Sequence, residues 1–426
     1  MTPRRHSPPH TMDVVVTFEY RFTRTPDGAV WSQMAYGYNF FRNHYLRVFD
    51  GVKVVARVQD VPTVLGSDFI RVDGPGVVVH ALPYYVGPAA YLRQFRRLAR
   101  AVRGAVGPTD AVILRVPSAI AKHMEPLLRR QRRPYGVQVV GDPVDIFGAI
   151  RHPLRPLLRW WFPRVQRRQC AGAAAASYVT EKALQRRYPC GGYTTHFSSV
   201  ELTPDAVAAA PRVPAPGQKR FTLLNVGSLD QLYKAPDVLI DAAASLVDEG
   251  LDLHLVFVGD GRFRPELEER ARARGVGGRV VFRGKLPAGP AVRAELDRAD
   301  LYVHPSRTEG LPRAIIEAMA RGLPVIGSTV GGIPELLDAQ DMVPPDDVTA
   351  LAGMIRAVLD DPARMAAMAA RNLARAADYG DEILRERRDA YFRYLRDATE
   401  KWSRDPLLPP PAPSHVEPEA PQKVTA

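Results

Sequence analysis

The chain has 426 residues, of which 46% are hydrophobic and 24% are charged. This composition is that of a globular protein and excludes a wholly disordered or fibrous chain, while the length suits two or three domains. The two cysteines, Cys170 and Cys190, are too few for a disulfide framework and stand in no zinc-binding spacing. No apolar run approaches the roughly 20 residues of a bilayer span. The charged first twelve residues lack an apolar stretch, so we expect no secretory signal and a cytoplasmic protein.

The positive charge is concentrated in one segment. The formal net charge is +12, and residues 90–170 contain 17 basic and 4 acidic residues, a local excess of +13. The remainder of the chain is therefore close to neutral. Such a segment indicates either a surface with a particular partner or simply an arginine-rich composition.

The first half of the chain alternates strand-like and helix-like segments. We expect residues 1–11 to be a disordered leader and residues 12–202 to form one α/β domain with a parallel sheet. The expected strands are Asp13–Phe18, Val52–Val58, Val77–Ala81, Ala111–Val116 and Val137–Val140. The clearest expected helices are Ala89–Val102 and Ala119–Gln131.

A proline-rich linker at 203–219 separates this domain from a second alternating unit at 220–378. The expected strands are Phe221–Val226, His254–Val258, Arg279–Arg283, Leu301–His304 and Pro324–Gly327. The expected helices are Pro236–Asp248, Arg264–Ala273, Ala291–Arg298, Pro312–Arg321, Val348–Leu359 and Pro362–Ala376. An amphipathic helix at 379–402 and a disordered proline-rich tail at 403–426 complete the chain.

The densest signal is PSRTEGLPRAIIEAMARGLPVIGSTVGGIPE at 305–335. A loop follows a strand here, and Pro312 stands where the first turn of a helix tolerates proline. Free backbone amides at such a helix N-terminus suit an anion or a hydroxyl-rich ligand, and ligands of parallel sheets lie beyond the carboxyl ends of the strands. Glu309 and Glu317 can each accept hydrogen bonds from a pair of vicinal hydroxyls. A capped helix with an acidic first turn is the alternative.

Glu309-x7-Glu317, with Gly322-Leu323-Pro324-Val325 and Gly331-Gly332-Ile333-Pro334-Glu335, resembles the signature of family 4 glycosyltransferases, which are retaining enzymes of the GT-B fold. The resemblance covers about residues 221–376. It implies two Rossmann-like domains facing a central cleft, with the acceptor on the first and the nucleotide-sugar donor on the second. It also implies that Glu309 contacts the donor sugar, that Gly310, Leu311, Pro312 and Arg313 hold sugar and phosphate oxygens, and that Glu317 binds the ribose.

Two further segments match this family. The resemblance places Lys234 at the donor diphosphate, where a cation stabilises the departing charge; a solvated surface lysine is the alternative. Ser228 stands where the family has an arginine, so either one phosphate contact is lost or a cation such as Arg313 or Arg262 replaces it. By the same resemblance, the strand ends at Gly259 and at Gly284, Lys285 and Leu286 line the pocket of the nucleobase.

The first half matches the family less well. Gly28 lies in the single-glycine loop PDGA, where the family has a glycine-containing loop facing the donor phosphates. Asp142 follows an expected strand near the position where related enzymes carry a histidine close to the reacting sugar carbon, which makes it a candidate catalytic residue. A turn or helix cap is the alternative for Asp142. The family's fold also implies that the helix at 379–402 crosses back to the first domain.

Several motifs are missing from the chain. It contains no Asp-x-Asp, no P-loop sequence and no G-x-G-x-x-G after the first strand. We therefore expect neither a metal nor a cofactor, beyond the nucleotide sugar as co-substrate. The sequence G-x-S-x-G is also absent, which disfavours hydrolases of that type.

The basic segment suggests a partner. Arginines accompany Leu92 and Phe95 in the first helix of this segment, and they accompany Trp160, Trp161 and Phe162 in residues 151–168. Arginine with tryptophan on an amphipathic stretch is typical of a helix on an anionic membrane surface, which would suit a lipid-linked acceptor and a location at the inner face of the membrane. The alternative is that the aromatic residues pack into the core. No nucleic-acid-binding module is present.

We therefore expect a metal-independent, retaining hexosyltransferase that uses a nucleotide-diphosphate sugar and a sugar or lipid-linked acceptor. Bacterial surface polysaccharide or glycoconjugate synthesis is the expected setting. The alternatives are a glycosyltransferase of a small-molecule natural product, a nucleotide-sugar epimerase or hydrolase of the same fold, and a basic scaffold that has lost catalysis.

Overall fold

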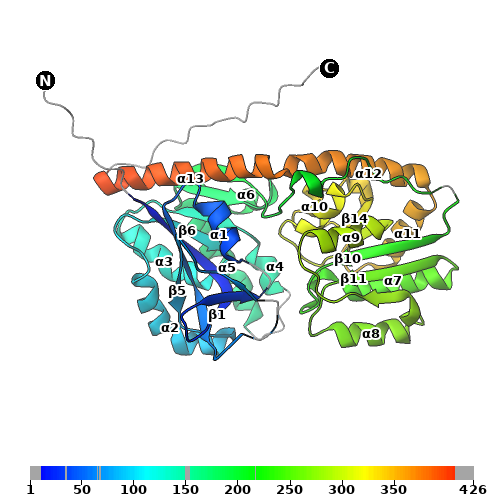
Figure 1. Ribbon diagram of the computed structural model, residues 1–426, viewed down its shortest axis with the longest axis horizontal. Helices are drawn as coiled ribbons and strands as arrows, with labels where there is room; N and C mark the ends of the chain where they lie inside the picture. The colour runs from blue at the N-terminus through cyan, green and yellow to red at the C-terminus, as the bar shows by residue number, and fades with distance from the viewer. Residues whose placement is uncertain are drawn as a thin grey trace, which may run out of the picture.

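The computed structural model describes residues 11–33, 36–64, 66, 69–148, 154–215 and 217–407. Within these residues the chain forms two α/β domains that lie side by side (Figure 1). Residues 1–10 of the expected leader and most of the expected tail lie outside the described residues, as does the start of the basic stretch at 151–168.

The first domain is built on a nine-stranded sheet. Seven strands follow the order β4-β2-β1-β6-β7-β8-β9, while β3 pairs with β1 and β5 pairs with β3. Its pairs are parallel, apart from the antiparallel pairs that β2 makes with β1 and with β4. The strands are β1 (Asp13–Arg24), β2 (Val30–Gln33), β3 (Gly51–Asp60), β4 (Phe69–Arg71), β5 (Val77–Leu82), β6 (Ala111–Val116), β7 (Gly136–Val139), β8 (Ala175–Tyr178) and β9 (Tyr193–His196).

The parallel strands of this sheet are buried on both faces. Val15 belongs to one hydrophobic cluster, whereas its neighbours Val14 and Val16 belong to the cluster on the opposite face. β1 continues six residues beyond the expected Phe18 because a register shift between Phe18 and Arg21 lets the strand go on pairing with β3.

The helices of the first domain are α1 (Tyr38–Tyr45), α2 (Gly87–Arg103), α3 (Ala119–Arg130), α4 (Pro143–Gly148), α5 (Arg155–Ala171) and α6 (Ala183–Arg187). Their limits follow local signals. For example, the Ser118 hydroxyl accepts a hydrogen bond of 2.9 Å from the amide of Ala121 and so caps α3.

The second domain has a six-stranded, all-parallel sheet in the order β12-β11-β10-β13-β14-β15. The strands are β10 (Arg220–Val226), β11 (Asp252–Val258), β12 (Val280–Phe282), β13 (Leu301–His304), β14 (Val325–Ser328) and β15 (Met342–Val343). The helices are α7 (Pro236–Asp248), α8 (Arg264–Ala273), α9 (Pro290–Arg298), α10 (Arg313–Ala320), α11 (Val348–Leu359) and α12 (Pro362–Ala376).

The last helix, α13 (Asp381–Arg404), follows α12 and lies along the first domain (Figure 1). The Tyr391 hydroxyl donates a hydrogen bond of 3.2 Å to the carbonyl of Val137 in β7, and the ring of Tyr394 stacks on Tyr193 of β9. Residues 206–212 of the expected linker pack against the second domain, where the amide of Ala208 donates 2.7 Å to the carbonyl of Ala320. No helix among the described residues is both long and apolar enough to cross a membrane.

Candidate active site in the interdomain cleft

Three cavities between the domains share lining residues and form one continuous cleft. The β11 cavity, of about 770 Å³, is lined from the second domain by Gly227, Ser228, Gly259, Asp260, Lys285 and Leu286. The Glu317 cavity, of about 680 Å³, shares Ala288 and Val292 with it. The arginine cavity, named for Arg115, Arg313 and Arg388, has about 290 Å³ and shares Arg313 with the Glu317 cavity. The carboxyl ends of strands from both sheets therefore meet here, as expected for a ligand site of parallel sheets.

Glu309 lies in the loop after β13 and faces the arginine cavity. Its Oε1 atom accepts hydrogen bonds from Lys234 Nζ at 2.9 Å and Ser306 Oγ at 2.9 Å, and contacts His304 Nε2 at 2.8 Å. The Nδ1 atom of His304 lies 3.1 Å from the Tyr302 hydroxyl. Lys234, Ser306 and His304 thus all contact the same carboxylate oxygen of Glu309.

The ionisation of this cluster follows from its charges. Burial alone would raise the pKa of Glu309, but the charge of Lys234 and the hydrogen bond with His304 outweigh it and lower the pKa to about 2. Burial, followed by the charge of Lys234, lowers the pKa of His304. Glu309 is therefore an anion and His304 is neutral at physiological pH, so a neutral His304 that holds its proton on Nε2 donates to Glu309.

Gly331 and Gly332 pack closely against the backbone of the Glu309 loop. A Cβ atom on Gly331, whose φ is +56°, would lie 2.0 Å from the carbonyl oxygen of Glu309. The amide of Gly332 donates 2.7 Å to the carbonyl of Gly310. Gly310 in turn approaches the first domain, because a Cβ there would lie 3.0 Å from the carbonyl of Val140. The glycines of the GGIPE segment are thus required by close backbone approach.

Lys234 reaches Glu309 across another glycine. A Cβ on Gly227 would lie 2.2 Å from Cδ of Lys234, so a larger residue would force the lysine side chain to shift. The Ser228 hydroxyl, 3.1 Å from the carboxylate of Asp230, belongs to a local turn. Arg262 donates from Nε to the carbonyl of Asp230 at 2.8 Å, which places its guanidinium beside the Ser228 loop.

The VGDG segment is also explained by close approach. A Cβ on Gly259 would meet the carbonyl oxygen of Gly227 at 1.9 Å, and the amide of Gly259 donates 2.8 Å to the carbonyl of Gly284. Lys285 and Leu286 follow directly and line the β11 cavity. The structure thus brings these predicted residues together with Ser228 on one wall of the cleft.

Glu317 is on α10 and lines the Glu317 cavity together with Arg293 and Arg313. Pro312 is the residue that caps α10, so the helix begins at Arg313. Burial raises the pKa of Glu317, and the charges of Arg313 and Arg293 oppose that rise. A carboxylate in this setting is short of hydrogen-bond donors, which ribose hydroxyls can supply.

Five predicted residues are not among those that line the three cavities. Lys234, Gly284 and Pro312 directly adjoin lining residues, whereas Gly28 and Asp142 lie apart from them. Gly28 is in the turn between β1 and β2, where its amide donates 2.9 Å to the carbonyl of Thr25. Asp142 is 5% exposed and accepts hydrogen bonds from the Tyr188 hydroxyl at 2.6 Å, from the amide of Val144 at 2.9 Å and from Arg187. Its partners match the alternative of a turn and helix cap, so its catalytic role stays a prediction.

Sequence reasoning missed the partners of Glu309 and the role of Glu335. The signal for His304 was its position as the last residue of a strand whose loop carries Glu309. The Glu335 carboxylate accepts from three consecutive amides of the first domain: Glu181 at 2.5 Å, Lys182 at 3.0 Å and Ala183 at 2.6 Å. It therefore binds the two domains together at the start of α6.

Known proteins are similar to this chain in sequence. Residues 220–361 match the family model described as Glycosyl transferases group 1. The chain is 28% identical over 313 residues to Protein CapJ of Staphylococcus aureus, covering 74% of this chain and 78% of that protein. It is 36% identical over 232 residues to the GDP-mannose-dependent monoacylated alpha-(1-6)-phosphatidylinositol monomannoside mannosyltransferase of Corynebacterium glutamicum, covering 50% of this chain and 60% of that protein. The chain is a glycosyltransferase. The expectation of a transferase is confirmed, and the second domain carries the matching group 1 segment.

Solved structures agree on the fold of this glycosyltransferase. The sucrose-phosphate synthase of Thermosynechococcus elongatus aligns with a TM-score of 0.67 at 18% identity, covering 91% of this chain and all of that one. HepE of Anabaena, solved in complex with UDP-glucose, aligns with a TM-score of 0.59 at 17% identity, covering 92% of this chain and 99% of that one. These likenesses and the two mainly parallel sheets confirm the expected GT-B fold.

Proposed function

We propose that this glycosyltransferase is a retaining, metal-independent enzyme of family 4. It moves a hexose from a nucleoside diphosphate to an acceptor hydroxyl in bacterial surface polysaccharide or glycoconjugate synthesis. The observation that carries the proposal is the position of Glu309, held through one oxygen by Lys234, His304 and Ser306, at the point where the second domain meets the first. Glu317 stands eight residues further on, in the adjoining cavity.

In this proposal the donor lies along the wall of the second domain. The base enters the β11 cavity at Lys285 and Leu286, the ribose hydroxyls donate to Glu317, and the diphosphate approaches Lys234 and the amides that precede α10. Lys234 is then both the counter-ion of Glu309 and the cation beside the departing charge, as the chemistry of a diphosphate leaving group requires. Ser228 stands where the family has an arginine, and Arg262 and Arg313 are the cations that can replace that arginine at the diphosphate.

The proposed chemical step is a front-face displacement. The bond from the anomeric carbon to the diphosphate oxygen breaks, the acceptor oxygen bonds to that carbon on the same face, and the acceptor proton passes to the departing phosphate oxygen. The products are the glycoside and the nucleoside diphosphate. Glu309 orients the sugar and offers negative charge near an anomeric centre that becomes electron-deficient.

The names of the similar proteins support the donor class, since one is GDP-mannose-dependent and another was crystallised with UDP-glucose. A thermal-shift screen with UDP-, GDP-, ADP- and dTDP-sugars identifies the donor, and Glu317→Ala should abolish the shift. Glu266→Ala, at an exposed position on α8, is the matched control.

Product analysis by NMR then tests the reaction itself. A retained anomeric configuration in an acceptor-linked product supports the proposal. An altered sugar without an acceptor indicates an epimerase, and release of free sugar as the sole product indicates a hydrolase. Absence of any shift with all four donors would favour the non-catalytic scaffold.

We further propose that α2 and α5 place the enzyme on an anionic membrane surface. Leu92 is 66% exposed on α2, and Trp160 is 55% exposed on α5. The ammonium of Lys122 lies 3.8 Å from the ring centre of Trp161 and 5.9 Å from that of Phe95, so the two helices contribute to one face. Exposed apolar side chains among arginines suit a membrane interface better than water.

A further inference from the structure

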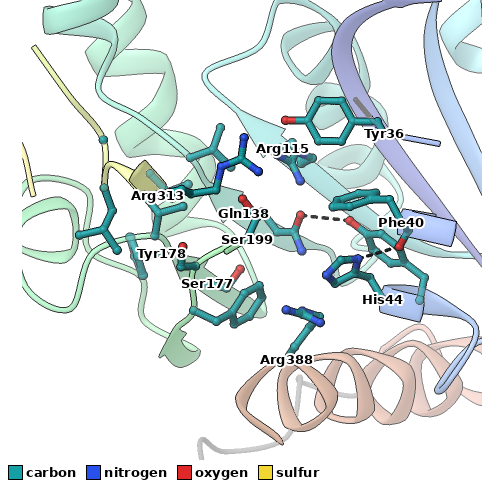
Figure 2. A pocket seen from close by; sticks show the side chains of 18 of the residues that line it. Tyr36, Phe40, His44, Arg115, Gln138, Ser177, Tyr178, Ser199, Arg313 and Arg388 are labelled. Atoms are coloured by element: carbon teal, nitrogen blue, oxygen red, sulfur yellow. Dashed lines mark hydrogen bonds between the residues drawn. The ribbon is translucent and has the colours of Figure 1, made fainter. Parts of the chain in front are cut away.

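The arginine cavity is lined by three arginines and, among acidic residues, by Glu309. It lies beyond the carboxyl ends of β6, β7 and β8, where Arg115 and Gln138 point into it, and α1, α13 and the Glu309 loop close it. In Figure 2, Arg115 and Arg313 face the cavity from one side, and Arg388 extends into it from α13 toward His44 on the other. Its volume of about 290 Å³ is near the lower limit for small-molecule sites.

None of these three arginines forms an ion pair with any described carboxylate. Arg388 is 5% exposed, and its Nη2 atom is buried without a hydrogen-bond partner. The neighbouring Asp389 pairs instead with Arg47 at 3.1 Å. The guanidinium carbon of Arg388 lies 5.6 Å from the ring centre of Phe197, but a buried N–H group without an acceptor is costly, so a ligand that supplies the missing acceptor is stabilised there.

Glu201 and Asp381 act on Arg388 from a neighbouring cavity, but neither forms an ion pair with it and neither lines the arginine cavity. Glu309 is the acidic residue that lines it, and its charge is already matched by Lys234 at 2.9 Å. Burial, together with the charges of Arg388 and Arg115, lowers the pKa of His44 to about 3, so His44 is neutral. Because Nδ1 of His44 lies 2.6 Å from the carbonyl of Phe40, the proton is on Nδ1 and Nε2 is free to accept a hydrogen bond.

We propose that this cavity binds the acceptor and that the acceptor carries a phosphate or carboxylate group held by Arg115 and Arg388. The inference rests on the proposed function and specifies its acceptor. Guanidinium groups pair with both anions through paired N–H donors. Arg115 lies on the first domain and Arg388 on α13, while Glu309 and Gly310 form the opposite wall. An acceptor anchored by its anion thus presents a hydroxyl toward the donor sugar.

Binding measurements with wild-type protein and UDP present test this proposal. The probes are glucose, glucose 6-phosphate, glucuronate, inorganic phosphate, pyrophosphate and a short prenyl phosphate in detergent, all at one ionic strength. We expect at least one anionic probe to bind and glucose not to bind. Stronger binding of the prenyl phosphate than of glucose 6-phosphate identifies a lipid-linked acceptor, and the reverse identifies a soluble one. Equal binding of glucose and its anionic derivatives, or no binding of any anion, overturns the proposal.

Variants locate the anion. Arg388→Gln and Arg115→Gln should each lower the affinity for the anionic probe about tenfold or more, which is the loss expected for a charge-assisted hydrogen bond. Arg388→Lys should recover part of the affinity. Arg393→Gln, on the same helix with a side chain 66% exposed, is the matched control. Unchanged anion affinity in both glutamine variants contradicts the assignment.

Measurements of stability and of nucleotide binding distinguish a failure of this inference from a failure of the proposed function. Because Nη2 of Arg388 is buried without a hydrogen-bond partner, Arg388→Met should raise the melting temperature of the ligand-free protein while it removes anion binding. A lower melting temperature with unchanged anion binding indicates a structural role and overturns the proposal. UDP affinity should stay within about twofold of wild type in every variant. Failure of UDP and GDP to bind even wild type counts against the proposed function, whereas failure of the anions alone counts against this inference.

Discussion

The ammonium group of Lys234 donates a hydrogen bond of 2.9 Å to Oε1 of Glu309, and the two side chains are only 13% and 9% exposed. The lysine follows β10 and the glutamate follows β13, which are neighbouring strands of the second sheet. The pair therefore joins two segments that a donor must contact together. A diphosphate that approaches Lys234 competes with Glu309 for the same cation, so donor binding alters the environment of the carboxylate.

Replacing Lys234 by methionine should therefore reduce both stability and turnover. The variant leaves a buried carboxylate with two neutral donors, so the free energy of unfolding should fall by about 3 kcal/mol. The transfer rate should fall about 100-fold, as for removal of one preorganised charge donor. Urea denaturation and initial rates measure the two effects. Lys219→Met, at an exposed position, should change neither. Adding Glu309→Gln should restore much of the stability and none of the rate.

The stabilising effect of this pair should also depend on pH. The pKa of Glu309 is lowered from 4.5 to about 2 in the folded protein. Its contribution is thus fully present above pH 4.5 and is lost as the pH falls from 4.5 toward 2. The stability difference between wild type and Lys234→Met should shrink over that interval. Urea midpoints at several acidic pH values check this, and a difference independent of pH would contradict it.

Much of the fold could be predicted because local signals mark its elements. The expected limits of α11 and α12 agree with the structure because Asp347 and Asp361 accept hydrogen bonds from the amides of Ala350 and Arg364 and so fix both N-termini. The extension of β1 and the pairing of β2 with β4 were not predicted. They depend on a register shift and on partners distant in sequence, which local periodicity does not encode.

The candidate site could likewise be predicted only in part. Glu309, Glu317 and the glycines stand at recognisable spacings, so the motif indicated them. Their partners were hidden, because His304 looks like the end of a buried strand. Arg388 lies on a helix 79 residues beyond Glu309 in the sequence and reaches the cleft because α13 lies along the first domain. Trp160 is exposed rather than in the core, which the pattern of α5 alone left open.

Glu317→Gln should weaken UDP binding and remove part of its pH dependence. Burial holds the pKa of Glu317 above 4.5 in the free protein, and hydroxyl donors of a ribose favour the ionised form. Wild-type affinity should therefore fall as the pH is lowered, beginning above pH 4.5, while the glutamine variant follows a flatter profile. At neutral pH the variant should bind about tenfold more weakly. Calorimetry with UDP measures both, with Glu266→Gln as the control, and parallel pH profiles would contradict the assignment.

Gly331→Ala should impair catalysis through the backbone. The new Cβ would fall 2.0 Å from the carbonyl of Glu309 at a φ of +56°, so the Glu309 loop must move. We expect lower stability by about 1 kcal/mol or more and a larger proportional loss of rate than of UDP affinity. Gly353→Ala is the matched control, because no atom lies within 4 Å of its Cβ position in α11; it should stabilise by about 1 kcal/mol. Wild-type rates in Gly331→Ala would show that the loop position does not matter.

Chelation should leave transfer unchanged. The proposal assigns the diphosphate charge to Lys234 and backbone amides, and the sequence has no Asp-x-Asp. Initial rates with EDTA, and with added Mg²⁺ or Mn²⁺, should therefore agree. A rate that falls with EDTA and returns with one metal would require a cation at the diphosphate.

The exposed residues of α2 and α5 should bring the enzyme to anionic vesicles. Leu157 and Trp160 are 56% and 55% exposed on α5, and the guanidinium of Arg164 lies 4.2 Å from the ring centre of Trp160. Sedimentation with phosphatidylcholine vesicles should increase when phosphatidylserine is included, and it should decrease with salt because the attraction is screened. Leu157→Ser with Trp160→Ser should abolish the binding, whereas Val213→Ser, at a position 74% exposed outside these helices, should not. Equal binding to neutral and anionic vesicles would contradict the proposal that the arginines of this face bind anionic lipid.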